Sequence, residues 1–271
     1  MNLSSLLKPR SHYWFWRNFL GDIRYLLKTN APGDVLLGYV KGRLLNNHST
    51  RPYLEAQRDF QNQLKSLSLS NDWFSENAAH WLTVFEAYGL ATATNLRALE
   101  IGSWEGLSSF FIVRTLPHAL LTCVDTWEGA DEHKSGDAAT NEVLSGIESA
   151  FDANLSRYRD RVTKYKGTSF SYFNNNPARS VFDLIYVDGS HQCDDVIIDA
   201  IKCFGLLKVG GIMIFDDYLW KYYPRAIENP AAAINAFLRL HKGSYKLVRL
   251  YSQIIIEKTC DRHQSNGRLA P

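Results

Sequence analysis

The chain has 271 residues, the size of one large domain or of one domain with an extension. Hydrophobic residues make up 45% and charged residues 21%, which predicts a folded core and excludes wholesale disorder. The formal charge of +2 excludes a polybasic nucleic-acid binder. No apolar run approaches the roughly 20 residues that span a bilayer.

The start of the chain and the cysteine spacing bear on where the protein is expected to be located. The first ten residues lack the apolar region and cleavage site of a secretory signal. The four cysteines (Cys123, Cys193, Cys203 and Cys260) have neither C-x-x-C nor metal-site spacing. We therefore expect reduced thiols and a cytoplasmic location.

The positive charge is concentrated near the start of the chain. Residues 1–65 contain ten Lys/Arg and four Asp/Glu, a net charge of +6, which leaves −4 for the rest. The aromatic stretch 13–20, followed by Ile23, Leu26 and Leu27, predicts an amphipathic helix with basic residues interleaved. We favour a helix that packs over the main domain or forms a homo-oligomer. The alternative is contact with an anionic membrane surface.

Three parts of the chain are expected. Residues 1–70 form a basic, aromatic helical extension, 71–260 the main domain and 261–271 a polar tail. Within the extension, Pro32, Gly33, Gly38 and Gly42 predict a loop broken by a short helix over residues 29–50.

From residue 71 onward, helical and β-type patterns alternate. Strands are expected at 97–102, 120–125, 162–167, 182–188 and 212–216, and two more within 245–258. Helices are expected from 71 to about 85 and at 107–116, 141–158, 194–207 and 231–240. The alternation predicts an α/β fold with a mainly parallel sheet of seven strands and helices on both faces. The last two strands are too close in sequence for a parallel crossover, so the sheet should end in an antiparallel hairpin.

Polar turns follow the first three strands. In the segment from Glu100 to Gly106, the glycines at 102 and 106 allow a tight turn and a close approach of the backbone to a ligand before a helix begins. Asp125 ends the second strand, where an acid can accept both hydroxyls of a ribose. Gly167-Thr168-Ser169 follows the third strand.

These motifs resemble those of class I S-adenosylmethionine-dependent methyltransferases, which have a Rossmann-like sheet. The resemblance covers about residues 95–258 and rests on E-x-G-x-x-x-G at 100–106, Asp-Thr-Trp at 125–127 and the closing hairpin. The wording IGSWEG and VDGSH…GG…FDDY is similar to small-molecule members grouped as methyltransferase domain family 24. Trp104 stands where the commoner pattern has a middle glycine. A Rossmann dehydrogenase would need glycines spaced G-x-G-x-x-G instead.

The resemblance implies roles by position. Glu100 would organise the turn and reach the methionine ammonium directly or through water, and the backbone of 102–106 would contact the methionine part. Asp125 would bind the ribose, Thr126 or Trp127 would lie near the adenine, and Ser169 would lie near its amine. The full set implied for cofactor binding is Glu100, Gly102, Ser103, Gly106, Asp125, Thr126, Trp127, Thr168, Ser169 and Asp188.

Acidic residues end the fourth and fifth strands. Asp188 and Asp216 would lie on neighbouring strands about 4.8 Å apart, so their carboxylates can converge on one hard cation. Asp217 supplies a third ligand if the chain bends there. The three positions resemble the Asp…Asp-Asp/Asn triad of metal-dependent O-methyltransferases, which implies Mg²⁺ or another divalent metal. A metal-free pocket built from the same residues is the alternative.

His191 stands three residues after Asp188, where the catechol-type enzymes of this superfamily place a lysine base. We interpret His191 as the general base, acting beside Asp188, against a histidine that bonds to the loop or faces solvent. Residues 131–137 are expected to form either a lid over the substrate or a solvated loop. The aromatic run Tyr218, Trp220, Tyr222 and Tyr223 predicts a wall for a ring-sized acceptor or is ordinary packing.

The sequence therefore predicts an enzyme that methylates an oxygen of a small hydroxylated metabolite. An N-directed or metal-independent methyltransferase and a non-catalytic cofactor-binding relative are the alternatives. Nucleic acid is not expected as substrate, because the fourth strand is not followed by the Asn/Asp-Pro-Pro-Tyr motif of base-flipping amino-methyltransferases.

Overall fold

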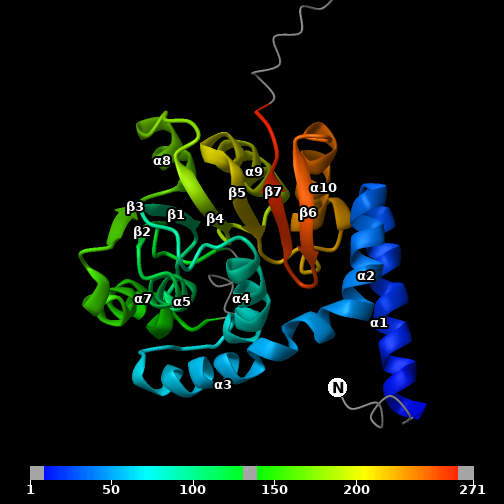
Figure 1. Cartoon of the computed structure of the whole chain (residues 1–271), viewed down its shortest axis with the longest axis horizontal. Helices are drawn as coiled ribbons and strands as arrows, with labels where there is room; N and C mark the ends of the chain where they lie inside the picture. The colour runs from blue at the N-terminus through cyan, green and yellow to red at the C-terminus, as the bar shows by residue number, and fades with distance from the viewer. Residues whose placement is uncertain (1–8, 131–138, 262–271) are drawn as a thin grey trace, which may run out of the picture.

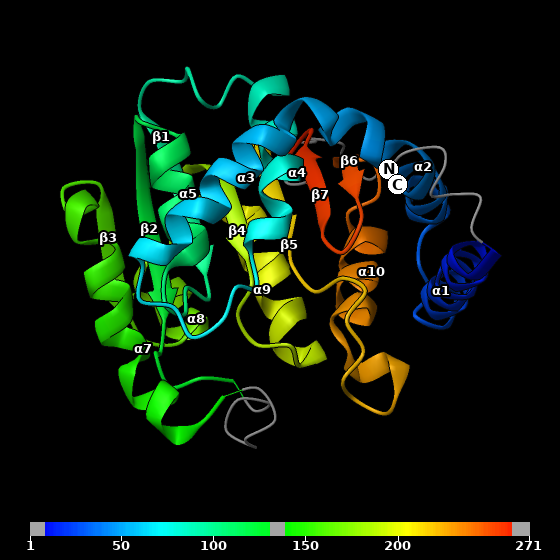
Figure 2. The same cartoon turned by 90° about the horizontal axis from the view of Figure 1, so that it is seen from below.

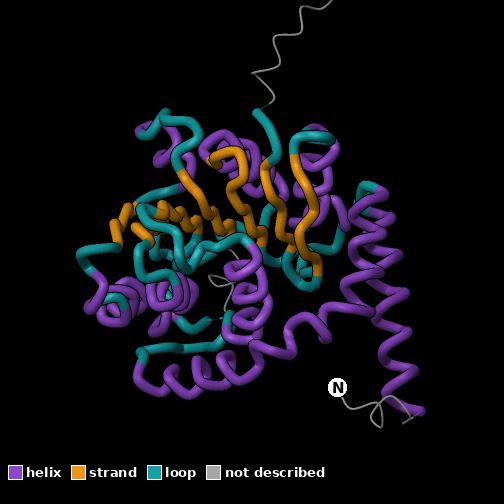
Figure 3. The backbone as a smooth tube through the Cα atoms, in the orientation of Figure 1, coloured by secondary structure: helices purple, strands orange, loops and turns teal. Residues whose placement is uncertain are grey.

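The computed structural model of the chain describes residues 9–130 and 139–261. Seven strands form one sheet in the spatial order β3-β2-β1-β4-β5-β7-β6, seen in Figure 3 as a row of strands between helices. The strands are β1 (Leu96–Ile101), β2 (Ala119–Asp125), β3 (Val162–Lys166), β4 (Phe182–Val187), β5 (Leu207–Phe215), β6 (Tyr245–Leu250) and β7 (Ile254–Lys258). The first five are parallel, whereas β7 is antiparallel to both β5 and β6. The predicted sheet and its closing hairpin are confirmed.

The central strands are apolar runs that are buried on both faces. In β4, Leu184, Ile185 and Tyr186 are at most 1% exposed, as expected for a parallel strand covered by helices on both sides. The strand order reverses between β1 and β4. In open sheets of this kind, ligands bind beyond the carboxyl ends of the strands at such a reversal.

Helices cover both faces of the sheet (Figure 1). One face carries α4 (Ala78–Ala87), α5 (Leu107–Thr115) and α7 (Asn141–Asn154), and the other carries α8 (Ser169–Asn175), α9 (Cys193–Leu206) and α10 (Pro230–Leu240). Two apolar clusters fill the two interfaces, and each contains residues from the helices of its own face. Short 3-10 turns occupy Arg51–Tyr53, Leu64–Ser66, Ser75–Asn77, Ser156–Tyr158 and Ala226–Glu228.

Three further helices precede the sheet. α1 (Pro9–Lys28) and α2 (Gly33–Thr50) lie beyond the β6 edge, and α3 (Leu54–Gln63) leads back toward α4. Figure 2 shows α1 at the outer margin of the molecule. Tyr25 and Leu26 belong to the same buried cluster as residues of α10 and β7, so the extension packs over the main domain as the favoured interpretation expected.

The expected loop over residues 29–50 is wrong, because most of this segment is α2. Gly38 lies inside that helix where it meets β6, and a Cβ atom there would be 2.2 Å from Cδ2 of Leu247. The glycine therefore permits close helix–strand packing instead of breaking the helix.

Two sequence predictions concern residues that the structure does not describe. The suggested lid at residues 131–137 lies outside the described residues, as do residues 262–271 of the predicted tail. Among the helices that the structure describes, none is long and apolar enough to cross a membrane.

Candidate active site

A cavity of about 900 Å³ opens at the carboxyl ends of the parallel strands. This is within the range of small-molecule and cofactor sites. Its wall includes most of the residues that the sequence singled out: Gly102, Ser103, Asp125, Thr126, Thr168, Ser169, Asp188, His191, Asp216 and Asp217. Side chains from five strand ends therefore share one space.

The turn after β1 is pressed against the end of β4. Gly102 has φ 83°, and a Cβ atom there would lie 1.8 Å from the carbonyl oxygen of Asp188. Only glycine fits this position without moving the neighbouring backbone. The contact places the Gly102–Ser103 backbone beside Asp188.

Glu100 lies beneath this turn and is fully buried. Its carboxylate accepts hydrogen bonds from the hydroxyls of Ser103 at 2.7 Å, Ser108 at 2.6 Å and Ser109. Burial raises the pKa of Glu100, and the three hydroxyls oppose that rise. The residue is not in the cavity wall, so its visible task is to organise the turn.

Asp125 holds the same turn from β2. Its Oδ2 accepts the backbone N–H of Ser103 at 2.7 Å and of Trp104 at 2.8 Å, and its Oδ1 accepts that of Trp127 at 2.6 Å. A carboxylate offers roughly four acceptor positions, and three are used here. Acceptor capacity therefore remains on Asp125 for a ribose hydroxyl.

Besides Glu100, two residues predicted to bind cofactor are not in the cavity wall. The ring of Trp127 packs against Phe151 at 5.0 Å, and its N–H donates to the carbonyl of Trp104. Gly106 begins α5, where a Cβ atom would lie 2.5 Å from the side chain of Leu155. Both residues serve packing behind the turn, and Thr126 lies at the cavity instead of Trp127.

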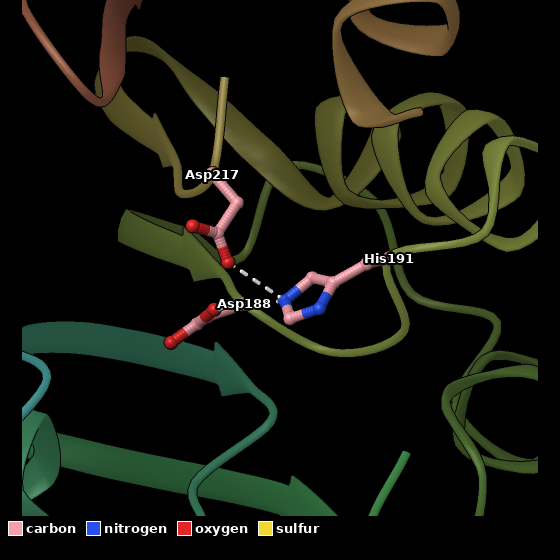
Figure 4. A group of neighbouring side chains, drawn as sticks. All are labelled: Asp188, His191 and Asp217. Atoms are coloured by element: carbon pink, nitrogen blue, oxygen red, sulfur yellow. Dashed lines mark ion pairs between the residues drawn. The ribbon is translucent and has the colours of Figure 1, made fainter. Parts of the chain in front are cut away.

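Asp188, His191 and Asp217 converge at the ends of β4 and β5 (Figure 4). One potential ligand atom from each lies within 4.8 Å of the others. His191 Nε2 is 2.8 Å from Asp217 Oδ2 and 3.8 Å from Asp188 Oδ1. Asp217 has φ 52°, an uncommon value for a non-glycine residue, so the chain bends at this residue.

Asp216 turns away from this group toward a buried hydrogen-bond network. Its Oδ2 accepts from the Tyr186 hydroxyl and from Gln253 Nε2 at 2.8 Å. Gln253 Oε1 in turn accepts the indole N–H of Trp81 at 2.7 Å, and the Tyr186 hydroxyl also lies 2.9 Å from Asp188 Oδ2. The three-residue group that the structure assembles thus contains His191 in the place predicted for Asp216.

The acids at this end of the cavity repel one another. Burial and the charge of Asp216 raise the pKa of Asp188 well above its usual range. Burial and the charge of Asp217 raise the pKa of Asp216 to about 6. A cation at this position would relieve the repulsion and lower both pKa values.

Comparison with known proteins accounts for this arrangement. A family model described as "methyltransferase domain" matches residues 99–218, which include every strand end of the cavity wall. The segment is a methyltransferase domain. The match agrees with the class I superfamily that the sequence motifs resemble.

Solved structures share the fold of this methyltransferase domain. The O-methyltransferase TomG from Streptomyces achromogenes, in complex with S-adenosylmethionine, is 15% identical with a TM-score of 0.50, over 78% of this chain and 90% of that one. MycE, from the mycinamycin biosynthetic pathway, is 15% identical with a TM-score of 0.51, over 78% of this chain and 56% of that one. At this identity the likeness establishes the fold alone. No curated protein matches the sequence.

Part of the predicted aromatic wall is present in the methyltransferase domain. Trp220 and Tyr222 line the cavity and stack on each other with ring centroids 5.2 Å apart. The ring of Trp220 also lies 4.7 Å from that of His191. Tyr218 is fully buried and donates to Asn235 at 2.6 Å, so it belongs to the core.

Asp199 of α9 is a cavity residue that the sequence analysis missed. It is 2% exposed, lies in the cavity wall, and its Oδ1 has no hydrogen-bond partner among the described residues. Burial raises its pKa to about 7, against a hydrogen bond from Ser169. A signal was available: Asp199 falls on the apolar face of its helix, between Val196 and Ala200.

Proposed function

We propose that this protein transfers a methyl group from S-adenosylmethionine to a hydroxyl oxygen of a small molecule, at a site that holds a divalent cation. The observation that carries the proposal is that the glycine turn after β1 and the Asp188–His191–Asp217 group line one cavity. A methyl donor at the turn and a hydroxyl at the acidic group would be neighbours, and such positioning supplies much of the rate of a transfer reaction.

The turn supports the cofactor part of the proposal. S-adenosylmethionine, when bound, supplies a methyl group on a positively charged sulfur. The glycine at residue 102 lets the turn lie directly against the Asp188 backbone, at the edge of the cavity. Asp125 fixes the backbone of Ser103 and Trp104 and keeps acceptor capacity for a ribose hydroxyl. These contacts preorganise the turn before any ligand arrives.

The donor set of the acidic group supports the cation. Two carboxylates and one imidazole are common ligands of divalent metals, and a bound metal lowers the pKa of a hydroxyl that it holds. A histidine in the set moves the preference from Mg²⁺ toward ions such as Mn²⁺ or Zn²⁺. MycE is described as a complex with Mg, and TomG as an O-methyltransferase.

His191 has a second use at the same position. If the cation is held by the carboxylates, His191 can accept the proton of the acceptor hydroxyl, and Asp217 at 2.8 Å stabilises the imidazolium that forms. The stacked rings of Trp220 and Tyr222 suit an acceptor with a flat ring or sugar face. We therefore propose an acceptor of this kind, a hydroxylated ring compound.

The test is titration of S-adenosylhomocysteine and of Mn²⁺ or Mg²⁺ into the full chain, with EDTA as the metal-free condition. We expect Asp217→Asn to abolish metal binding and to retain S-adenosylhomocysteine binding. Asp194→Asn, an exposed acid in the first turn of α9, is the matched control and should change neither. If S-adenosylhomocysteine does not bind under any condition, the proposal fails.

Turnover on a panel of sugars and catechols then separates the alternatives. Transfer to a hydroxyl that EDTA stops and that Mn²⁺ or Mg²⁺ restores supports the proposal. Transfer that EDTA does not affect, or transfer to nitrogen, favours the metal-independent or N-directed enzyme. Cofactor binding with no transfer to any acceptor favours a non-catalytic relative.

A further inference from the structure

Helix α1 keeps one apolar face exposed although its opposite face is packed. Tyr25 and Leu26 are at most 7% exposed, whereas Trp16, Leu20 and Leu27 are 51–59% exposed. With 3.6 residues per turn, these three side chains fall within roughly 40° of the helix surface. They form a continuous stripe, which we call the apolar stripe.

A row of cations runs beside the apolar stripe. Arg17, Arg24 and Lys28 are all exposed and occupy the next ~80° of the helix surface. The single acid in the sequence of α1 is Asp22. It lies on the packed side, where it accepts from Tyr39 at 2.8 Å and pairs with Lys221 at 2.7 Å. Among the residues of α1 whose burial is described, the apolar stripe and the cationic row therefore contain no acid.

We infer that α1 docks this protein on an anionic phospholipid surface, with the apolar stripe in the headgroup–acyl boundary and the cationic row against lipid phosphates. An apolar face flanked by Arg and Lys is the pattern of helices that lie in the membrane interface. A second copy of the chain is a poorer occupant. In an antiparallel two-fold pair of α1 helices, the cationic row would face the same row of its copy, which is repulsive.

The docking helix is connected to the candidate active site. The Tyr25 hydroxyl donates to the carbonyl of Trp220 at 3.0 Å, and Asp22 pairs with Lys221. The ring of Trp220 lines the main cavity. The inference itself depends only on α1 and stands apart from the proposed activity.

The experiment is flotation of the full chain with vesicles of phosphatidylcholine alone or mixed with phosphatidylglycerol, at low and high salt. We expect binding to the mixed vesicles only, weakening as salt rises. Arg17→Gln with Arg24→Gln should weaken binding about fivefold for each cation removed. Leu20→Gln with Leu27→Gln should weaken it at least as much. Ile201→Gln with Lys202→Gln, an exposed apolar–cationic pair on α9, is the matched control and should bind as the wild type does.

Three outcomes would overturn the inference. One is a wild-type chain that does not float with the mixed vesicles. Another is binding that neither α1 double variant reduces relative to the control. The third is a concentration-dependent dimer in sedimentation that Leu20→Gln with Leu27→Gln dissociates, without vesicle binding, which would assign the stripe to a second copy. S-adenosylhomocysteine binding and thermal unfolding of each variant verify that it is folded.

Discussion

We expect Gly102→Ala to destabilise the protein much more than Gly210→Ala, although the two glycines have nearly the same positive φ. Their φ angles are 83° and 82°. An alanine in this left-handed region costs roughly 1–2 kcal/mol, and this backbone cost applies equally at both positions. The comparison therefore isolates the surroundings of the added methyl group.

The surroundings differ sharply. At residue 102 the Cβ atom would lie 1.8 Å from the carbonyl oxygen of Asp188 and 2.8 Å from the Cα atom of Gly189, whereas nothing lies within 4 Å at residue 210. These are backbone atoms, which cannot rotate away as a flexible side chain does. Overpacking of this kind adds about 1–3 kcal/mol or more. We expect losses of roughly 2–5 kcal/mol for Gly102→Ala and 1–2 kcal/mol for Gly210→Ala.

The assay is urea unfolding of both variants, with S-adenosylhomocysteine titration of each folded protein. Gly102→Ala should also lose S-adenosylhomocysteine binding, because displacing the Asp188 backbone also moves the turn after β1 and the Asp188–His191–Asp217 group. Gly210→Ala should bind normally. Equal free energies of unfolding for the two variants would refute the reasoning, because the close approach at Gly102 would then have no energetic effect.

Three other predictions concern buried polar groups. Burial lowers the pKa of His80 to about 3 from its ordinary 6.5, so the unfolded chain binds more protons between these values. The contribution of His80 to the free energy of unfolding is therefore complete above pH 6.5 and falls by up to ~1.4 kcal/mol per pH unit toward pH 3. His80→Gln should reduce this pH dependence in urea titrations. An unchanged pH dependence would contradict the prediction. The pKa of Asp199 is raised to about 7 from 3.8, so its contribution is full below pH 3.8 and is lost as pH rises through 7. Asp199→Asn should therefore unfold at higher urea than wild type at pH 8 but not at pH 4, and weaker S-adenosylhomocysteine binding by this variant would mark the acid as a ligand contact. Gln253→Leu should lower the free energy of unfolding by about 2–4 kcal/mol in the same assay, because Trp81 Nε1 and Asp216 Oδ2 each lose their hydrogen bond to the Gln253 amide. A loss below 1 kcal/mol would show that other groups or water replace the amide.

The sequence carried enough local information to predict the main domain. Runs such as Leu184-Ile185-Tyr186-Val187 are apolar over the length of a buried strand, and the patterns between the strands have helical periodicity. The order of these patterns, with a hairpin at the end, corresponds to the sheet that the structure shows. Because parallel strands end at one edge of the sheet, the same order also predicted that Asp125, Asp188 and Asp217 share one cavity.

Local patterns were less informative where a residue serves a distant contact. The glycines of residues 29–50 predicted a loop, but Gly38 lies in a helix, where it lets Leu247 of β6, more than two hundred residues later, pack closely against the helix. Propensity describes a segment alone, and tertiary packing overrides it. Trp127 and Gly106 were assigned to the cofactor for a similar reason, since their motif positions do not reveal that Phe151 and Leu155 lie behind them.

The sequence alone determined which strands end in acids, and the tertiary structure decided which of those acids face one another. Asp216 and Asp217 are the same amino acid and are neighbours in the sequence. Their difference arises from the backbone bend at Asp217 and from Gln253, which reaches Asp216 from the turn between β6 and β7. The direction of these two side chains depends on the backbone angle at Asp217 and on a partner remote in sequence. The local sequence pattern contains neither piece of information.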